Sequence, residues 1–171
     1  PHADPIHKVS IMPRGRAMGV TQTLPEKDTY VVSREFLADR MAVMMGGRAA
    51  EQLVLETATS GAENDLKEAA QLARTMVLDW GMSERLGHLA LGTRREHVFL
   101  GEEIGSHREY SETTAREVDE EVRRLTDASY ERALGILKTH RAGLDRLARA
   151  LLEQEELRGE EALELIGTSS E

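Results

Sequence analysis

The sequence contains no cysteine, and this absence excludes several kinds of site at once. Disulfide frameworks, thiolate metal sites and thiol nucleophiles are all ruled out, so histidine and carboxylate groups are the only strong metal ligands available. Positive charge is also scarce, because 22 basic residues face 31 acidic ones and the formal net charge is −9. A nucleic-acid-binding surface needs clustered lysine and arginine, so we expect no nucleic-acid partner.

Long hydrophobic runs are missing as well. The longest unbroken apolar stretch runs from Met41 to Met45, far short of the ~18 residues that cross a membrane. We therefore expect the chain itself to be soluble. It starts at Pro1 with neither an initiator methionine nor a charged and then apolar leader, so we interpret this start as a cut within a longer polypeptide.

Several catalytic motifs are absent. The sequence has no Gly-x-x-x-x-Gly-Lys-Ser/Thr phosphate-binding loop and no serine in a Gly-x-Ser-x-Gly turn, which argues against that mode of nucleotide binding and against a serine nucleophile. No two of the six histidines lie four residues apart with a glutamate between them. A zincin site needs two such imidazoles on one helical face, so this chain alone does not complete one.

Residues 6–24 have the alternating pattern of β-strands. Val9 and Ile11 alternate with polar residues, Pro13 to Gly15 reads as a turn, and Met18 to Leu24 alternates with small residues. We predict a short sheet or hairpin here. The small residues on one face would let an extended peptide pair with its edge, although an ordinary hairpin that closes one side of the core explains the same pattern.

The next segment predicts a central helix that runs from the N-cap Ser33 to about Glu56, with apolar residues around most of its circumference. Gly46 and Gly47 lie in its middle. Each lowers helix propensity by roughly 1 kcal/mol, which suggests that another backbone packs closely against them.

Charged residues on two predicted helices are candidates for a functional site. Arg48 and Glu51 lie three residues apart in the apolar stripe of the first helix, which favours a buried ion pair over a role at a site. A second helix follows the loop at residues 59–62, and Asp65 in its first turn flanks the apolar stripe beside Leu66. An acid there suits the helix dipole, but its position beside the stripe leaves room for a second role.

The C-terminal half is predicted to be helical. Residues 87–105 are punctuated by glycine and sparsely patterned, which indicates a loop or an irregular surface hairpin. A long helix begins after Ser111, and two shorter apolar patterns follow it. The fold class is therefore mainly α, with a small N-terminal β-sheet or hairpin over 1–32, central helices and a loop over 33–105, and a long C-terminal helical hairpin over 106–171.

Five motifs stand out in a fixed order along the chain. They are Asp4 to Gly15, Met18 to Gln22, Gly46 to Glu51, Thr59 to Leu66, and Trp80 to Ser83. This series closely resembles the peptidase domain of the FtsH family, which comprises membrane-anchored, ATP-dependent zinc metalloproteases. The similarity continues into the long C-terminal helix and so covers nearly the whole chain, which implies a helical peptidase domain over 1–171.

The resemblance implies a zinc protease within a larger assembly. In that family the chain runs from a membrane anchor through an AAA+ ATPase module to the peptidase domain, which assembles as a homo-hexamer on the cytoplasmic side of the bacterial inner membrane. The ATPase module uses ATP and Mg to unfold and thread polypeptide substrates, including unfolded or membrane proteins, and the chamber cleaves them. Neither ATP nor Mg is expected to bind to the present chain.

The resemblance also implies roles for residues of this sequence. Zinc is held by two histidines of a His-Glu-x-x-His helix, whose glutamate is the general base, and by an aspartate that matches Asp65. Glu51 is expected to have a supporting or structural role through its pairing with Arg48 rather than to bind zinc. The strand beside the catalytic cleft, where a substrate peptide would pair, is matched by Met18, Gly19, Val20, Thr21 and Gln22.

The His-Glu-x-x-His motif itself does not occur in this sequence. We expect that helix a short distance upstream of Pro1, so this chain supplies at most one of three protein ligands to zinc and no general base. The chain alone is therefore predicted neither to bind zinc tightly nor to hydrolyse peptides. A non-catalytic helical module for oligomerisation or scaffolding is the alternative that the chain's own residues support.

Overall fold

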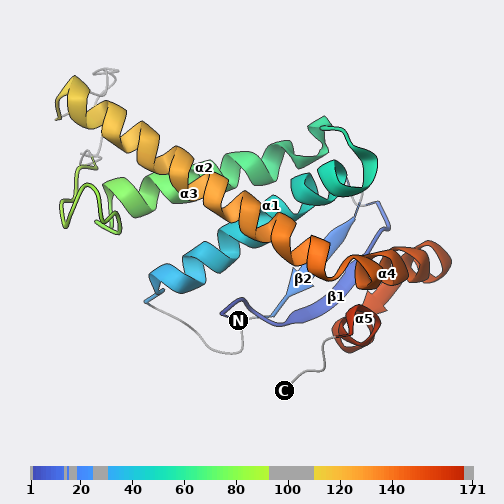
Figure 1. Cartoon of the computed structure of the whole chain (residues 1–171). Coiled ribbons are helices and arrows are strands. Elements are labelled where there is room, and N and C mark those ends of the chain that lie inside the picture. The colour runs from blue at the N-terminus through green and yellow to red at the C-terminus, as the bar shows by residue number, and fades with distance from the viewer. Residues whose placement is uncertain (1, 14, 16–18, 25–30, 93–109, 168–171) are drawn as a thin grey trace.

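The computed structural model describes residues 2–13, 15, 19–24, 31–92 and 110–167. Figure 1 shows long helices that pack together, with a small sheet and shorter helices at one end of them. The predicted mainly α fold with a small antiparallel sheet is therefore confirmed. Within the described residues the elements are, in order, β1 (Ile6–Ser10), β2 (Val20–Thr23), α1 (Arg34–Leu55), the 3-10 helix η1 (Ser60–Ala62), α2 (Glu63–Leu78), α3 (Glu112–Thr139), α4 (Arg141–Gln154), β3 (Glu156–Arg158) and α5 (Gly159–Ile166).

Parts of three predictions lie outside the described residues. These are Arg14 in the predicted turn, Met18 in the predicted substrate strand, and residues 93–105 of the predicted loop.

Both long helices that the sequence caps with serine begin where predicted. The Ser33 Oγ accepts a hydrogen bond from the Phe36 backbone N–H at 3.2 Å, and the Ser111 Oγ accepts one from the Thr114 N–H at the same distance. Each bond satisfies a backbone donor that the first turn of a helix leaves without an intrahelical partner. The side-chain caps therefore set the starts of α1 and α3.

The two glycines in the middle of α1 do not meet the expectation from the sequence. Among the described residues, no atom outside the helix's own backbone lies within 4 Å of a Cβ built on Gly46 or Gly47. The predicted close approach of another backbone is therefore wrong in this part of the chain. Gly46 instead lines a hollow of about 220 Å³ together with Ala42, Ala133 and Ile136.

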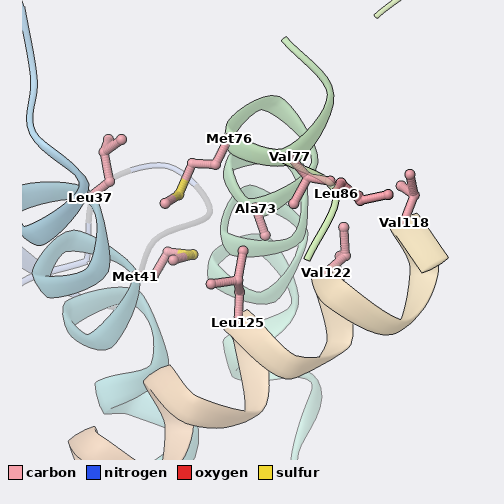
Figure 2. Packing of buried hydrophobic residues seen from close by; sticks show 9 residues of the cluster. All are labelled: Leu37, Met41, Ala73, Met76, Val77, Leu86, Val118, Val122 and Leu125. Atoms are coloured by element: carbon pink, nitrogen blue, oxygen red, sulfur yellow. The ribbon is translucent and has the colours of Figure 1, made fainter. Parts of the chain in front are cut away.

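Helices α1, α2 and α3 pack around a shared apolar core (Figure 2). Met41 of α1 and Val77 of α2 are fully buried, and Val118 of α3 is 1% exposed. Burying a side chain of this size stabilises the fold by about 1.5–3 kcal/mol. A second cluster continues the same interface, and its buried members are Met45, Ala49, Ala69 and Ala133.

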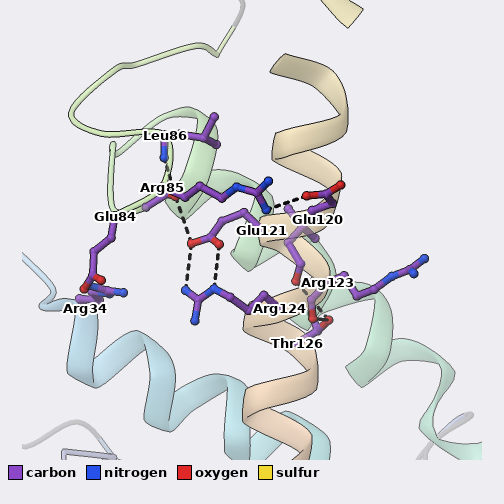
Figure 3. A network of polar contacts seen from close by, with 11 residues as sticks. Arg34, Glu84, Arg85, Leu86, Glu120, Glu121, Arg123, Arg124 and Thr126 are labelled. Carbon is purple, nitrogen blue, oxygen red and sulfur yellow. Dashed lines mark hydrogen bonds and ion pairs between the residues drawn. The ribbon is translucent and has the colours of Figure 1, made fainter. Parts of the chain in front are cut away.

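A buried carboxylate joins the loop after α2 to α3 (Figure 3). Glu121 of α3 is 1% exposed and accepts hydrogen bonds from the Ser83 Oγ at 3.0 Å and from the Arg124 Nε and Nη2 at 2.8 and 2.9 Å. These bonds compensate the charge of Glu121, because a buried charge without partners is strongly destabilising. The contact holds the loop that begins at residue 79 against the N-terminal half of α3.

The sheet is antiparallel with the strand order β2-β1-β3. Val9 pairs with Thr21 on one side and with Leu157 on the other, so the last strand comes from the C-terminal end of the chain. Strand β3 was not among the elements predicted from the sequence. Gly159 follows it directly, and a Cβ at this position would lie 1.8 Å from the Ile6 carbonyl oxygen, so the two backbones pack closely here.

The C-terminal region is helical as predicted, but its helices divide between two partners. Helix α3 packs on α1 and α2, whereas α4 packs mainly on α5 and β3. The backbone of α4 approaches α5 so closely that a Cβ on Gly143 would lie 2.7 Å from the Ile166 carbonyl oxygen. None of the helices described here is both long and apolar enough to span a bilayer.

Candidate functional site

The site begins with a pair of charges on the last turns of α1. The Arg48 Nη1 lies 3.1 Å from the Glu51 Oε2, and the two side chains are 23% and 18% exposed. The ion pair that the sequence predicts is therefore present, and it is half-buried rather than enclosed. A helical spacing of three residues places the two side chains on one face, where they can meet.

Glu51 also binds the turn that follows α1. Its carboxylate accepts a hydrogen bond from the Thr59 hydroxyl at 2.5 Å and another from the Thr59 backbone N–H at 3.2 Å. These two bonds, together with the positive charge of Arg48, hold the pKa of Glu51 below its usual range. Both oxygens of this carboxylate are thus already engaged within the chain.

Asp65 lies in the first turn of α2 and is an exposed residue, so its carboxylate can be reached from outside. Partial desolvation of the carboxyl group raises the pKa of Asp65, and the negative charge of Glu68 one turn later raises it further. A carboxylate whose charge is poorly compensated in this way is one that a cation would stabilise.

Asp65 and Glu51 belong to the same corner of the molecule but have different surroundings. Glu51 holds Thr59, η1 follows directly, and η1 leads without a break into α2 and Asp65. The described residues contain no group of three histidine, aspartate or glutamate side chains that could hold a metal ion. Asp65 therefore follows closely after the turn that Glu51 holds. The described residues do not supply the other ligands that a metal ion would need there.

Strand β2 forms one end of the three-stranded sheet. Gly19 precedes it, and Val20, Thr21 and Gln22 belong to it with exposed side chains. In the described part of the chain, β2 pairs only with β1, so its second edge has no strand partner. Such an edge presents the backbone N–H and C=O groups with which an extended peptide can pair.

Three charged or polar contacts are absent from the sequence-based predictions. Thr59 lies within one of the five motifs, but its contact with Glu51 depends on a turn that no spacing rule predicts. The buried Asp39, which pairs with Arg132 across α1 and α3, also has no sequence signal. Glu121 does have one, because it follows Val118 by three residues and thus falls at the edge of the apolar stripe.

Comparison with known proteins gives one consistent family. The sequence model described as peptidase family M41 matches residues 1–165. The ATP-dependent zinc metalloprotease FtsH 2 of Salinibacter ruber is 56% identical over 166 residues, which are 97% of this chain and 24% of that protein. The FtsH of Nitrosococcus oceani is 49% identical over 92% of this chain and 25% of its own length.

The FtsH of Thermotoga maritima is 45% identical over the whole of this chain and 28% of its own length. The chain thus spans about a quarter of the length of the curated relatives that it matches. Because the family match covers nearly every element described above, this chain belongs to peptidase family M41 and corresponds to the peptidase part of the FtsH proteins that it matches.

Proposed function

We propose that this chain, as a single domain over residues 1–171, is the peptidase part of an ATP-dependent zinc metalloendopeptidase that degrades polypeptides. In this proposal the longer polypeptide also carries an AAA+ ATPase module and a membrane anchor, assembles as a homo-hexamer and acts at the cytoplasmic side of a bacterial inner membrane on unfolded or membrane proteins. It is supported by the relatives, which are named ATP-dependent zinc metalloproteases and are about four times as long as this chain. ATP and Mg would act in the ATPase module.

The observation that carries the proposal is the environment of Asp65. A carboxylate oxygen is a suitable zinc ligand, and this one is accessible and poorly compensated in charge. The described residues fit zinc only in part, because they offer this ligand without a set of three. Asp65 would hold one position on the ion, and two histidines from a His-Glu-x-x-His helix upstream of Pro1 would complete the set.

A zinc ion bound there would act as a Lewis acid on the peptide carbonyl group. Asp65 would contribute negative charge and fix one side of the site. Glu51 and Arg48 would have a supporting role and would not bind zinc, since the Glu51 carboxylate already accepts hydrogen bonds from Arg48 and Thr59. Without the upstream helix the chain would lack the general base and would be inactive alone.

Substrate would bind in an extended form along the edge of β2 that has no strand partner in the described part of the chain. The strand residues Val20, Thr21 and Gln22, with Gly19 before them and Met18 outside the described residues, would supply backbone donors and acceptors rather than side-chain pockets. Pairing through the backbone is tolerant of sequence, which suits a protease that degrades many polypeptides. The net charge of −9 agrees with a polypeptide rather than a nucleic-acid substrate.

Replacing the proposed ligand tests the function. In the longer polypeptide that includes the His-Glu-x-x-His helix, Asp65→Ala should abolish peptide hydrolysis and remove most of the bound zinc, because one of three protein ligands is lost. Zinc content is measured by elemental analysis and helical content by circular dichroism, which should not change. The present chain alone is the negative control, which should show neither bound zinc nor peptide hydrolysis.

The matched control is Glu63→Ala, which removes another exposed acid from the same turn of α2. It should leave zinc content and activity near those of the unmodified protein. Full activity of the Asp65→Ala protein would contradict the assignment of Asp65, and stoichiometric zinc or hydrolysis in the chain that starts at Pro1 would contradict its inactivity.

A further inference from the structure

Thr59 joins α1 to the start of the helical stretch that carries Asp65. Its hydroxyl group donates to the Glu51 Oε1 at 2.5 Å and accepts from the Gly61 backbone N–H at 3.0 Å. The Thr59 backbone N–H donates to the other Glu51 oxygen at 3.2 Å. One residue therefore uses three hydrogen bonds to connect a side chain of α1 with the backbone of η1.

The helical stretch 60–78 has its side-chain cap at Thr59 and not at the junction with α2. Helix η1 begins with Thr59 as its N-cap, whereas the N-cap of α2 is Ala62, which makes no side-chain cap bond. Ala62 is 4% exposed, so it fixes the inner side of the turn by packing alone. The direction in which α2 leaves the turn thus depends on the contacts of Thr59.

The Glu51 end of this connection is held in place as well. Arg48 pairs with the carboxylate from one turn earlier, and both side chains are largely removed from water. A Cβ at Gly61 would lie 3.2 Å from the Thr59 Oγ1 and 3.4 Å from the Glu51 Oε1, so the turn packs directly against the two groups. Both ends of the connection are therefore held by contacts within this part of the chain.

We propose that Thr59 is a positioning residue for Asp65. It ties the first turn of the 60–78 stretch to Glu51 of α1 and thereby sets where the Asp65 carboxylate lies. The proposal rests on the proposed function, in which Asp65 is a zinc ligand. It matters because a ligand must be held within about 0.5 Å of its working position by residues behind it.

The first test measures zinc affinity in the longer polypeptide by competition with a chromophoric chelator. Thr59→Val keeps the shape of the side chain but removes the hydroxyl group, and it should weaken zinc binding about 10- to 100-fold, the usual effect of losing a group that orients a metal ligand. Thr59→Ser restores the hydroxyl group and should restore the affinity. The same two variants are loaded with Co²⁺, whose absorption spectrum should change with valine and return with serine.

The second test uses the present chain and needs no metal. Hydrogen exchange followed by NMR should show faster exchange at the Gly61 amide in Thr59→Val, because that N–H loses its acceptor, and protection should return in Thr59→Ser. Amides in the buried middle of α3 should keep their exchange rates in both variants. A general loss of stability would instead raise exchange in all helices.

The outcomes separate this inference from the proposed function. If Thr59→Val keeps wild-type zinc affinity and the wild-type Co²⁺ spectrum while Asp65→Ala loses zinc, the positioning role of Thr59 is wrong and the zinc assignment stands. If Asp65→Ala keeps its zinc, the proposed function is wrong and the inference fails with it. Weaker zinc binding by Thr59→Val, rescued by Thr59→Ser, supports both.

Discussion

The molecule has two regions that are stabilised in different ways. The helical unit, formed by α1, α2 and α3, encloses two clusters of buried apolar side chains. The sheet unit, formed by the three strands with α4 and α5, buries fewer large side chains and is held by strand pairing and by backbones in close contact at Gly143 and Gly159. The first unit should therefore be sensitive to lost volume and the second to added volume.

Polar contacts tie the helical unit to the sheet unit and to the segment that precedes β1. The His2 backbone N–H donates to the Asp39 carboxylate at 2.9 Å, and Asp39 in turn pairs with Arg132 of α3. The Arg141 Nη1 donates to the Leu53 carbonyl oxygen at 3.3 Å, which ties the start of α4 to the end of α1. Because these links are local, damage to one unit can be measured separately from damage to the other.

The largest expected effect is a cavity in the helical unit. Met41 of α1 is fully buried in the core that α1 shares with α2 and α3. Met41→Ala should therefore lower the free energy of unfolding by about 2–5 kcal/mol. Urea unfolding followed by circular dichroism measures the change. The control is Val43→Ala on the same helix, where the side chain is 61% exposed and the loss should be much smaller. Equal losses in the two variants would contradict the packing described for this core.

The next effect is a steric conflict in the sheet unit. In Gly159→Ala the new methyl group meets the Ile6 carbonyl oxygen, and β1 and β3 must move apart, so the unfolding free energy should fall by about 1–3 kcal/mol. Hydrogen exchange should rise first at the β1–β3 pairs. Gly47→Ala is the matched control, since no neighbour among the described residues lies within 4 Å of a Cβ at that position and the replacement should instead stabilise α1 by about 0.5–1 kcal/mol. Destabilisation by Gly47→Ala would mean that the face of α1 is covered.

The smallest effect concerns pH. Hydrogen bonds from Arg124 and then from Ser83 lower the pKa of the buried Glu121, so its ionised form stabilises the fold above the unfolded glutamate pKa of about 4.3. That contribution is lost as the pH falls through the lower folded pKa. Glu121→Gln should therefore cost about 1 kcal/mol at neutral pH and progressively less in acid, as measured by urea unfolding across pH.

Glu161 of the sheet unit provides the comparison for the pH series. The backbone and side chain of Arg158 lower the pKa of Glu161 as well, but its side chain is 43% exposed and water screens the interaction. Glu161→Gln should change the pH dependence less than Glu121→Gln. A larger effect at Glu161 would contradict the burial difference between the two units.

The parts of the fold that the sequence predicted depend on local rules. Ser33 and Ser111 cap helices by bonding residues three positions away, and the apolar period of α1 lies within a single helix. Strand β3 escaped prediction because its three residues acquire strand geometry only by pairing with β1, far away in the sequence. The prediction that another backbone packs against the two glycines of α1 was wrong, because the absence of a side chain does not show whether a neighbour fills the space.

For the candidate site, too, the sequence predicted the features that follow local rules and not those that depend on contacts between separate parts of the chain. The pairing of Arg48 with Glu51 follows from their spacing on one helix, and the position of Asp65 beside the apolar stripe follows from its place in the first turn of α2. The role of Thr59 does not follow from either rule, because it arises where the turn brings the chain back to α1. Contacts of that kind become visible only when the turn has a definite geometry.

The pairing of β1 with β3 has a consequence for how the protein is made. Lys8 and Glu156 meet across the sheet although 148 positions separate them, so the sheet is completed only after nearly the whole chain has been synthesised. Until then the second edge of β1 has no partner, while the helices between the two strands can already fold. An edge that stays open for so long can pair with other chains, which makes the speed of this last closure important for the yield of native protein.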